Sequence, residues 1–90
     1  MPINIYEAES YKTIAYLSND DWELPIQVEE LEKWLNTIGN ELSEGKYVAD
    51  IAFDIRKDAT GGGAVINSNM INVLSKIGME IYLSEYPQND

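Results

Sequence analysis

The stretch YVADIAFDIRKD, residues 47–58, constrains the fold more than any other because its apolar and polar side chains alternate. Alternation with a period of two is typical of a strand that is buried on one face only. The face predicted to be buried carries Tyr47, Ala49, Ile51, Phe53 and Ile55. The opposite face carries Val48, Asp50, Ala52, Asp54 and Arg56. We therefore expect a central strand in a sheet with one apolar and one polar face.

A helical period precedes this strand, from about residue 27 to residue 43. The apolar stripe of this helix consists of Val28, Leu31, Leu35, Ile38 and Leu42. Pro25 is expected just ahead of the helix, and Gly45 just after its end. Gly39 would lie inside it, at a cost of about 1 kcal/mol relative to alanine. Glu29 and Lys33 are spaced for an ion pair one turn apart.

Shorter patterns predict three further strands and a second helix. Residues 3–6 and 11–18 are rich in strand-forming residues and would form a hairpin around the turn EAES. Asn67 or Ser68 could cap a helix that Gly78 would end. Residues 79–86 alternate again, with Met79, Ile81 and Leu83 facing inward and Glu80, Tyr82 and Ser84 facing outward.

The resulting element order is β-β-α-β-α-β, in one α+β domain that covers residues 1–90. We expect a two-layer sandwich, in which a four-stranded, mainly antiparallel sheet carries both helices on one face. The uncovered face would then carry Asp50, Asp54, Arg56, Glu80 and Tyr82.

Composition restricts the chemistry of any site. The chain has neither cysteine nor histidine, so it offers no disulfide, no thiolate nucleophile and no imidazole base or metal ligand. We expect no catalytic residue, no metal and no cofactor. Sixteen acidic and six basic residues give a formal net charge of −10, which repels nucleic acid and anionic membranes and attracts basic proteins.

The sequence also predicts a cytoplasmic location. Its beginning, MPINIYEAES, lacks the basic and apolar regions of a signal peptide. No apolar run approaches the ~18 residues that a membrane span requires.

The glycine run within KDATGGGAVINSNM, residues 57–70, is a candidate phosphate-binding loop. A P-loop requires G-x-x-x-x-G-K-[ST], and a dinucleotide-binding fold requires G-x-G-x-x-G. Here Gly61, Gly62 and Gly63 are consecutive, and the nearby Arg56 and Lys57 precede them. We interpret the run as a connection that is free to take positive φ. A nucleotide-binding or small-ligand-binding loop is the alternative.

The candidate binding residues are mainly carboxylates. Asp50 and Asp54 are about 13 Å apart along one strand, which is too far for the carboxylate pair of a glycosidase. Together with Glu80 they would form an acidic surface on the open face of the sheet, with Tyr82 as an aromatic anchor. A second acidic patch on the first helix would consist of Glu29, Glu30 and Glu32. The other aromatic residues could serve either binding or packing: Tyr6, Tyr11, Tyr16, Trp22 and Tyr86.

The segment from Trp22 to Pro87 resembles the carboxy-terminal part of the bacterial domain-of-unknown-function family 4279. The resemblance lies in Trp22 at a strand end, the helix LEKWLNTIGNEL, the strand VADIAFDI, and the segments INSNMINVLSKIG and MEIYLSEY. It covers about two-thirds of the chain and implies an α+β sandwich, but it transfers no catalytic residue. This chain is shorter than the family pattern, and two brief strands replace the usual amino-terminal portion.

These features favour a small, acidic, non-enzymatic protein that binds and neutralises a basic partner protein. A toxin-immunity protein would fit, as would a phage-type inhibitor of a host defence nuclease or nucleic-acid-binding enzyme. One alternative is a ligand-binding domain that uses the glycine run. Another is a structural homo-oligomer, such as a homodimer, joined through the open face or an edge strand.

Overall fold

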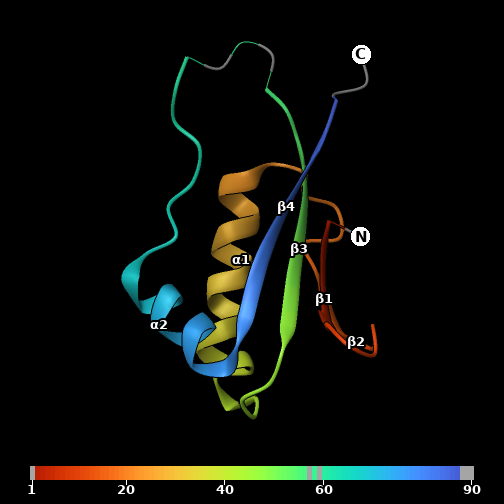
Figure 1. Cartoon of the computed structure of the whole chain (residues 1–90). Coiled ribbons are helices and arrows are strands. Elements are labelled where there is room, and N and C mark those ends of the chain that lie inside the picture. Colours follow the sequence, from red (N-terminus) through yellow and green to blue (C-terminus); the bar gives the residue numbers. More distant parts are fainter. Residues whose placement is uncertain (1, 57, 59, 88–90) are drawn as a thin grey trace.

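A computed structural model of the chain describes residues 2–56, 58 and 60–87. The elements follow the predicted order (Figure 1): β1 (Ile3–Glu7), β2 (Thr13–Leu17), α1 (Leu24–Thr37), the 3-10 turn η1 (Gly39–Glu41), β3 (Tyr47–Asp54), α2 (Ser68–Ile77) and β4 (Met79–Tyr86). The α+β class and the β-β-α-β-α-β order are confirmed.

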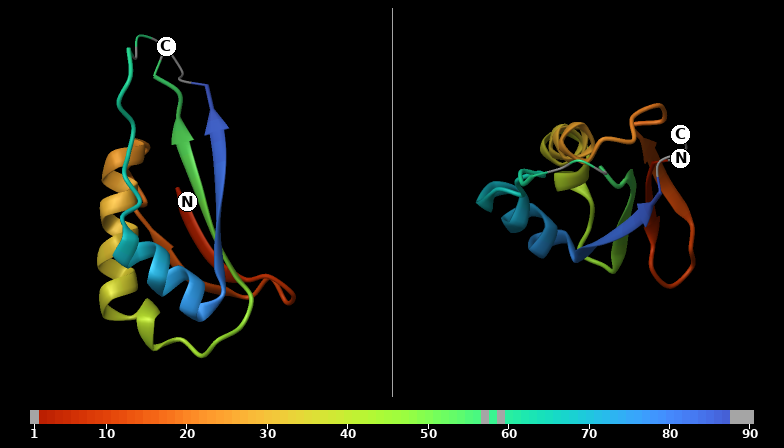
Figure 2. Two further views of the ribbon diagram at one scale, coloured as in Figure 1. Left: turned by 60° about the vertical axis from the view of Figure 1, so that its left-hand side comes forward. Right: turned by 90° about the horizontal axis from the view of Figure 1, so that it is seen from above.

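The four strands form one mixed sheet in the order β2-β1-β3-β4. Strand β1 is antiparallel to both β2 and β3, whereas β3 and β4 are parallel. The sheet is therefore mainly antiparallel, as predicted, and β3 is an inner strand. Both helices lie on one side of it, and α2 is the crossover between the two parallel strands (Figures 1 and 2).

The core lies between the helices and one face of the sheet. Ala49 and Ile51 of β3 are fully buried there, as the alternation of residues 47–58 predicts. The other strands and the helices contribute Ile3, Ile5, Leu31, Leu35, Met70, Leu74, Ile77 and Met79. Two residues that were expected to face the core are not buried: Ile55 is 43% exposed and Leu83 is 57% exposed. Strand β3 ends at Asp54, and α2 packs beside the beginning of β4 rather than its second half (Figure 2).

The first helix both begins and ends earlier in the sequence than its apolar pattern predicts. It begins at Leu24, so that Pro25 lies in the first turn, and it ends at Thr37. Gly39 therefore follows the helix, and a Cβ there would lie 2.7 Å from Cζ3 of Trp34. Glycine is required at this position because the Trp34 indole leaves no space for a side chain. Gly45 was expected to end the helix, and this is wrong, because α1 ends before it. Lys33 pairs with Glu30 at 3.8 Å instead of with Glu29.

The ends of α2 match the sequence prediction closely. Asn67 is the N-cap, and its side chain accepts a hydrogen bond from the backbone N–H of Met70 at 2.9 Å. Gly78 ends the helix in the left-handed conformation, with φ +82°, and donates its N–H to Leu74 O at 3.0 Å. A Cβ on Gly78 would collide with the backbone carbonyl oxygen of Gly45.

We expect Gly78→Ala to lower the free energy of unfolding by about 3 kcal/mol. The left-handed conformation alone costs an L-residue about 1–2 kcal/mol, and the collision with Gly45 adds to it. Gly62→Ala is a matched control, since Gly62 has φ +83° but only the Arg56 side chain within 4 Å, at 3.6 Å. Urea unfolding followed by tryptophan fluorescence would measure both variants. Equal losses would show that the approach of Gly45 does not restrict this position.

Candidate functional site

The side of the sheet that faces away from the helices is a candidate binding surface, which we call the open face. Strand register defines it. Asn4 of β1 pairs with Tyr16 of β2 and with Asp50 of β3, and Asp50 pairs with Tyr82 of β4. The next row contains Tyr6, Val48 and Glu80, and a further row contains Asp54 and Tyr86. We define the open face by these residues: Asn4, Tyr6, Tyr16, Val48, Asp50, Asp54, Glu80, Tyr82 and Tyr86.

Large side chains pack against one another on this face. Val48 is only 2% exposed, yet it is not part of the core cluster between sheet and helices. Its neighbours in the register are Tyr6 and Glu80, so their side chains cover it. Tyr6 also stacks on Tyr11, with ring centroids 5.9 Å apart and an interplanar angle of 25°. The open face is therefore an organised layer rather than a set of isolated side chains.

Tyrosine is concentrated here. Of the chain's six tyrosines, only Tyr47 belongs to the core side, where its hydroxyl donates to Ser43 O at 2.7 Å. Tyr82 is the tyrosine that the sequence singles out, and it is 48% exposed on this face. For the others, the sequence left the choice between binding and packing open: Tyr6, Tyr11, Tyr16 and Tyr86. The alternation of INIY with the buried Ile3 and Ile5 is the signal that could have placed Tyr6.

A second aromatic cluster forms where β3 ends. Trp22 packs edge-to-face against Tyr86, with centroids 6.0 Å apart and planes at 82°. The backbone N–H of Asp54 donates to Trp22 O at 2.9 Å, which fixes the segment before α1 beside β3. Trp22, Asp54, Tyr86 and Pro87 line a cleft of about 510 Å³. A carboxylate beside two aromatic walls suits a cationic side chain.

A buried glutamine holds that segment in place. Gln27 of α1 is fully buried and donates through Nε2 to Asp21 O at 2.9 Å and to Ala52 O at 2.7 Å. It therefore connects the helix, the segment before it and β3. Sequence reasoning did not identify Gln27, because a polar residue near a helix start gives no sign of burial.

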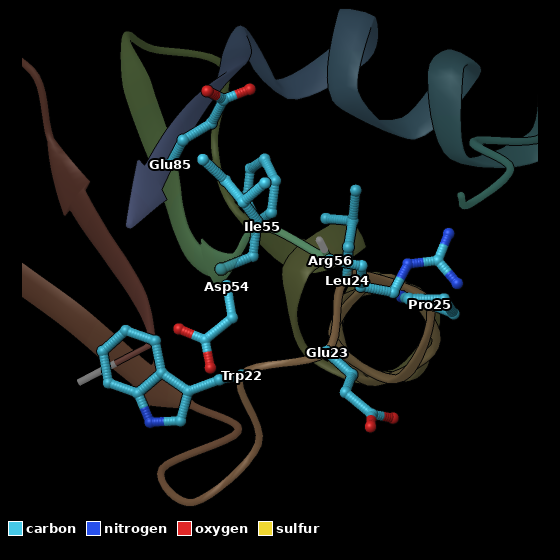
Figure 3. A pocket seen from close by; sticks show the side chains of 9 residues that line it. Trp22, Glu23, Leu24, Pro25, Asp54, Ile55, Arg56 and Glu85 are labelled. Atoms are coloured by element: carbon cyan, nitrogen blue, oxygen red, sulfur yellow. The ribbon is translucent and has the colours of Figure 1, made fainter. Parts of the chain in front are cut away.

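The open face is acidic. No lysine or arginine lies within any of the four strands, whereas Asp50, Asp54 and Glu80 lie on this face. The Asp50 carboxylate accepts a hydrogen bond from Ser84 Oγ at 2.8 Å. Arg56 was expected on the open face, and this is wrong. It follows the end of β3, and Figure 3 shows it near Leu24 and Pro25 of α1.

The helix patch does not join this surface. Glu29, Glu30 and Glu32 belong to α1, which covers the opposite face of the sheet (Figure 1). Glu32 accepts a hydrogen bond from Asn67 Nδ2 at 2.6 Å, and Glu30 is paired with Lys33. Two of the three carboxylates therefore have contacts within the chain. Of the predicted binding residues, the open face collects those of the strands: Asp50, Asp54, Glu80 and Tyr82.

The glycine run forms an exposed part of the connection between β3 and α2. Gly61, Gly62 and Gly63 all have positive φ, of 132°, 83° and 131°, in agreement with the predicted connection. Residues 64–67 separate the run from α2, whose first turn is already capped by Asn67. The Arg56 guanidinium donates to Gly61 O at 3.2 Å.

A second cleft, of about 520 Å³, lies between the start of α1 and the end of β3 (Figure 3). Its apolar lining includes Leu24, Phe53 and Ile55, and its charged groups are Glu23, Asp54, Arg56 and Glu85. In the searched part of the chain, no three histidine, cysteine, aspartate or glutamate residues gather as a metal site. No helix of the described residues has the length and apolar character needed to cross a membrane.

Comparisons with protein-family models, curated proteins and solved structures found no match to this chain. The resemblance to family 4279 therefore stays an expectation from the sequence.

The open face changes the acidity of one tyrosine. Burial raises the pKa of the Tyr6 hydroxyl above its ordinary value, and the negative charge of Asp50 raises it further, with Tyr82 and Tyr11 adding to the effect. The folded chain therefore favours the neutral phenol. This contribution to stability is complete below about pH 10 and is lost as the pH rises through the pKa of the folded state.

We expect Asp50→Asn to lower the pKa of Tyr6, because it removes a negative charge that favours the neutral phenol. The measurement is a pH titration of the Tyr6 Cζ signal by NMR on protein with ¹³C-labelled tyrosine. Asp54→Asn is the matched control, since Asp54 is not among the groups that shift Tyr6. An unchanged Tyr6 pKa in Asp50→Asn would contradict the inferred effect of the Asp50 charge on Tyr6.

Proposed function

We propose that this chain is a small, non-enzymatic, acidic protein that binds and neutralises a basic partner protein through its open face. Support comes mainly from the residues of that face: Tyr6, Tyr16, Tyr82 and Tyr86 share it with Asp50, Asp54 and Glu80, and the strands contain no lysine or arginine. No described helix covers this side of the sheet (Figure 2).

Tyrosine suits a binding surface for two physical reasons. Its ring buries a large apolar area at a small cost in side-chain entropy, and its hydroxyl still forms hydrogen bonds. Protein interfaces are enriched in tyrosine, tryptophan and arginine, which often carry most of the binding energy. The half-exposed Tyr82 and Tyr86 fit this role, and Trp22 extends the surface at its end.

The charge favours a basic partner. A chain of net charge −10 attracts a positively charged protein over long distances and speeds the encounter, and this effect weakens as salt is added. At contact, Asp54 between Trp22 and Tyr86 offers a carboxylate and two aromatic rings to an arginine or lysine side chain.

Proteins that act on nucleic acids present basic surfaces to the phosphate backbone. We therefore assign the partner to the class of toxins or nucleic-acid-handling enzymes, with this chain acting as an immunity protein or as a phage-type inhibitor of a host defence enzyme. The same acidic surface would repel nucleic acid and anionic membranes, so neither is proposed as a direct partner. A cytoplasmic location is part of this proposal.

The test begins with an affinity pull-down from the lysate of the native host, with nuclease added, at low and at high salt, read by mass spectrometry. We expect one basic protein that is retained at low salt and lost at high salt. Nuclease ensures that the capture does not pass through nucleic acid. Recovery of this chain alone, or of no protein, would count against the proposal.

With that partner purified, we expect the double variant Asp50→Lys, Asp54→Lys to weaken binding by about tenfold or more, mainly through charge on the contact surface. Glu29→Lys with Glu41→Lys makes the same change in net charge on the helix side, where both residues are exposed. This control should weaken binding much less. Calorimetry would measure both. Equal losses would mean that net charge alone, and not the open face, determines the affinity.

A further inference from the structure

The outer edge of β4 is the least protected part of the sheet. The strand order leaves β2 and β4 as the two edges. Strand β2 has five residues, and its pairing with β1 is interrupted by a register shift between Ile5 and Tyr6. Strand β4 has eight residues, and its register with β3 runs without a shift from Met79 to Tyr86. A long, regular edge strand is a template for another strand.

The hydrogen bonds with β3 identify which backbone groups of β4 are free. Gly78 O accepts from the N–H of Tyr47, and Tyr86 O accepts from the N–H of Ile55, both at 3.0 Å. Even-numbered residues of this strand therefore direct their N–H and C=O toward β3. Because these groups alternate along a strand, the N–H and C=O of Ile81, Leu83 and Glu85 point to the outer edge.

The side chains of β4 do not block this edge. Natural edge strands are often protected by lysine, proline or a bulge, and the strand MEIYLSEY contains neither lysine nor proline. Its side chains also offer contacts on both faces of the sheet. Tyr82 is half exposed on the open face, and Leu83 is 57% exposed on the other.

Charge distinguishes between possible occupants. Glu80 and Glu85 are the charged residues of β4, and the whole chain carries −10. A second copy would bring the same carboxylates and the same net charge to the edge. A strand with basic residues on the side of Glu80 and Tyr82, and apolar residues on the side of Leu83, would complement both faces.

We propose that β4 binds an extended segment of the partner as a fifth strand of the sheet. This inference rests on the proposed function, which supplies the positive charge of the partner. The backbone of Ile81, Leu83 and Glu85 forms the hydrogen bonds, and the segment alternates arginine or lysine with apolar residues. The added strand would extend the open face beyond Tyr82 and Tyr86, so that backbone pairing and the acidic surface act on one partner.

The test uses two synthetic peptides of equal charge, (Arg-Val)4 and (Arg-Pro)4. The first can form a strand, whereas proline lacks the N–H donor and disfavours pairing. We expect (Arg-Val)4 to bind at least about tenfold more tightly at 0.15 M salt, as the loss of a few hydrogen bonds implies. Hydrogen exchange by NMR should slow at the amides of Ile81, Leu83 and Glu85 when (Arg-Val)4 is added.

Two substitutions at one position separate backbone from side chain without a change in charge. Leu83→Ala removes the side chain and keeps the N–H, whereas Leu83→Pro also removes the outward N–H. Proline is tolerated on the solvent side of an edge strand, and circular dichroism would verify that the variant is folded. We expect Leu83→Pro to bind (Arg-Val)4 several-fold less tightly than Leu83→Ala does, as the loss of one hydrogen bond implies.

Three results would overturn this inference. The first is equal affinity of the chain for (Arg-Val)4 and (Arg-Pro)4. The second is equal affinity of Leu83→Pro and Leu83→Ala for (Arg-Val)4. Either result would mean that the peptide is attracted by charge alone. The third is a dimer in sedimentation without peptide that Leu83→Pro abolishes, since the occupant would then be a second copy. The proposed function is tested separately, because Asp50→Lys with Asp54→Lys would still weaken binding of the captured partner if only the edge inference failed.

Discussion

Strand β3 is hydrogen-bonded along both edges, to β1 on one side and to β4 on the other, and the rest of the structure depends on this. Its position fixes which side chains face the helices. Ala49 and Ile51 are buried beneath α1 and α2, so Val48, Asp50 and Asp54 must lie on the other face. A shift of one residue in register would bury the carboxylates and expose the core. The same alternation therefore specifies both the fold and the candidate site.

The open face combines features that a surface serving only solubility does not need. Carboxylates alone would keep a small domain soluble. Here tyrosines share the face with them, Tyr6 and Glu80 cover Val48, and burial together with the charge of Asp50 raises the pKa of Tyr6. The side chains are thereby held in position before any partner arrives, which lowers the entropic cost of binding. Asp50 is held by Ser84, and Asp54 lies beside the Trp22–Tyr86 pair.

Much of the fold could be predicted from local patterns, and the rest could not for physical reasons. Alternation identified β3 and β4, and cap chemistry identified Gly78 and limited the start of α2 to Asn67 or Ser68. The predicted end of α1 was wrong because Leu42 continues the apolar period. The helix in fact ends at Thr37, shortly before Gly39, where Trp34 leaves no room for a Cβ. The aromatic surface needed strand pairing: Tyr6, Tyr16 and Tyr86 come from three strands, and only their register shows that they share a face.

The central claim is that partners bind the open face, and the tyrosine NMR spectrum tests it most directly. Protein with ¹³C-labelled tyrosine would be titrated with the basic partner recovered from the host. Tyr47 is an internal reference, because its hydroxyl is bonded to Ser43 O on the core side. We predict that the signals of Tyr6, Tyr82 and Tyr86 shift or broaden while that of Tyr47 stays unchanged. A bound partner that leaves Tyr82 and Tyr86 unaffected would contradict this account.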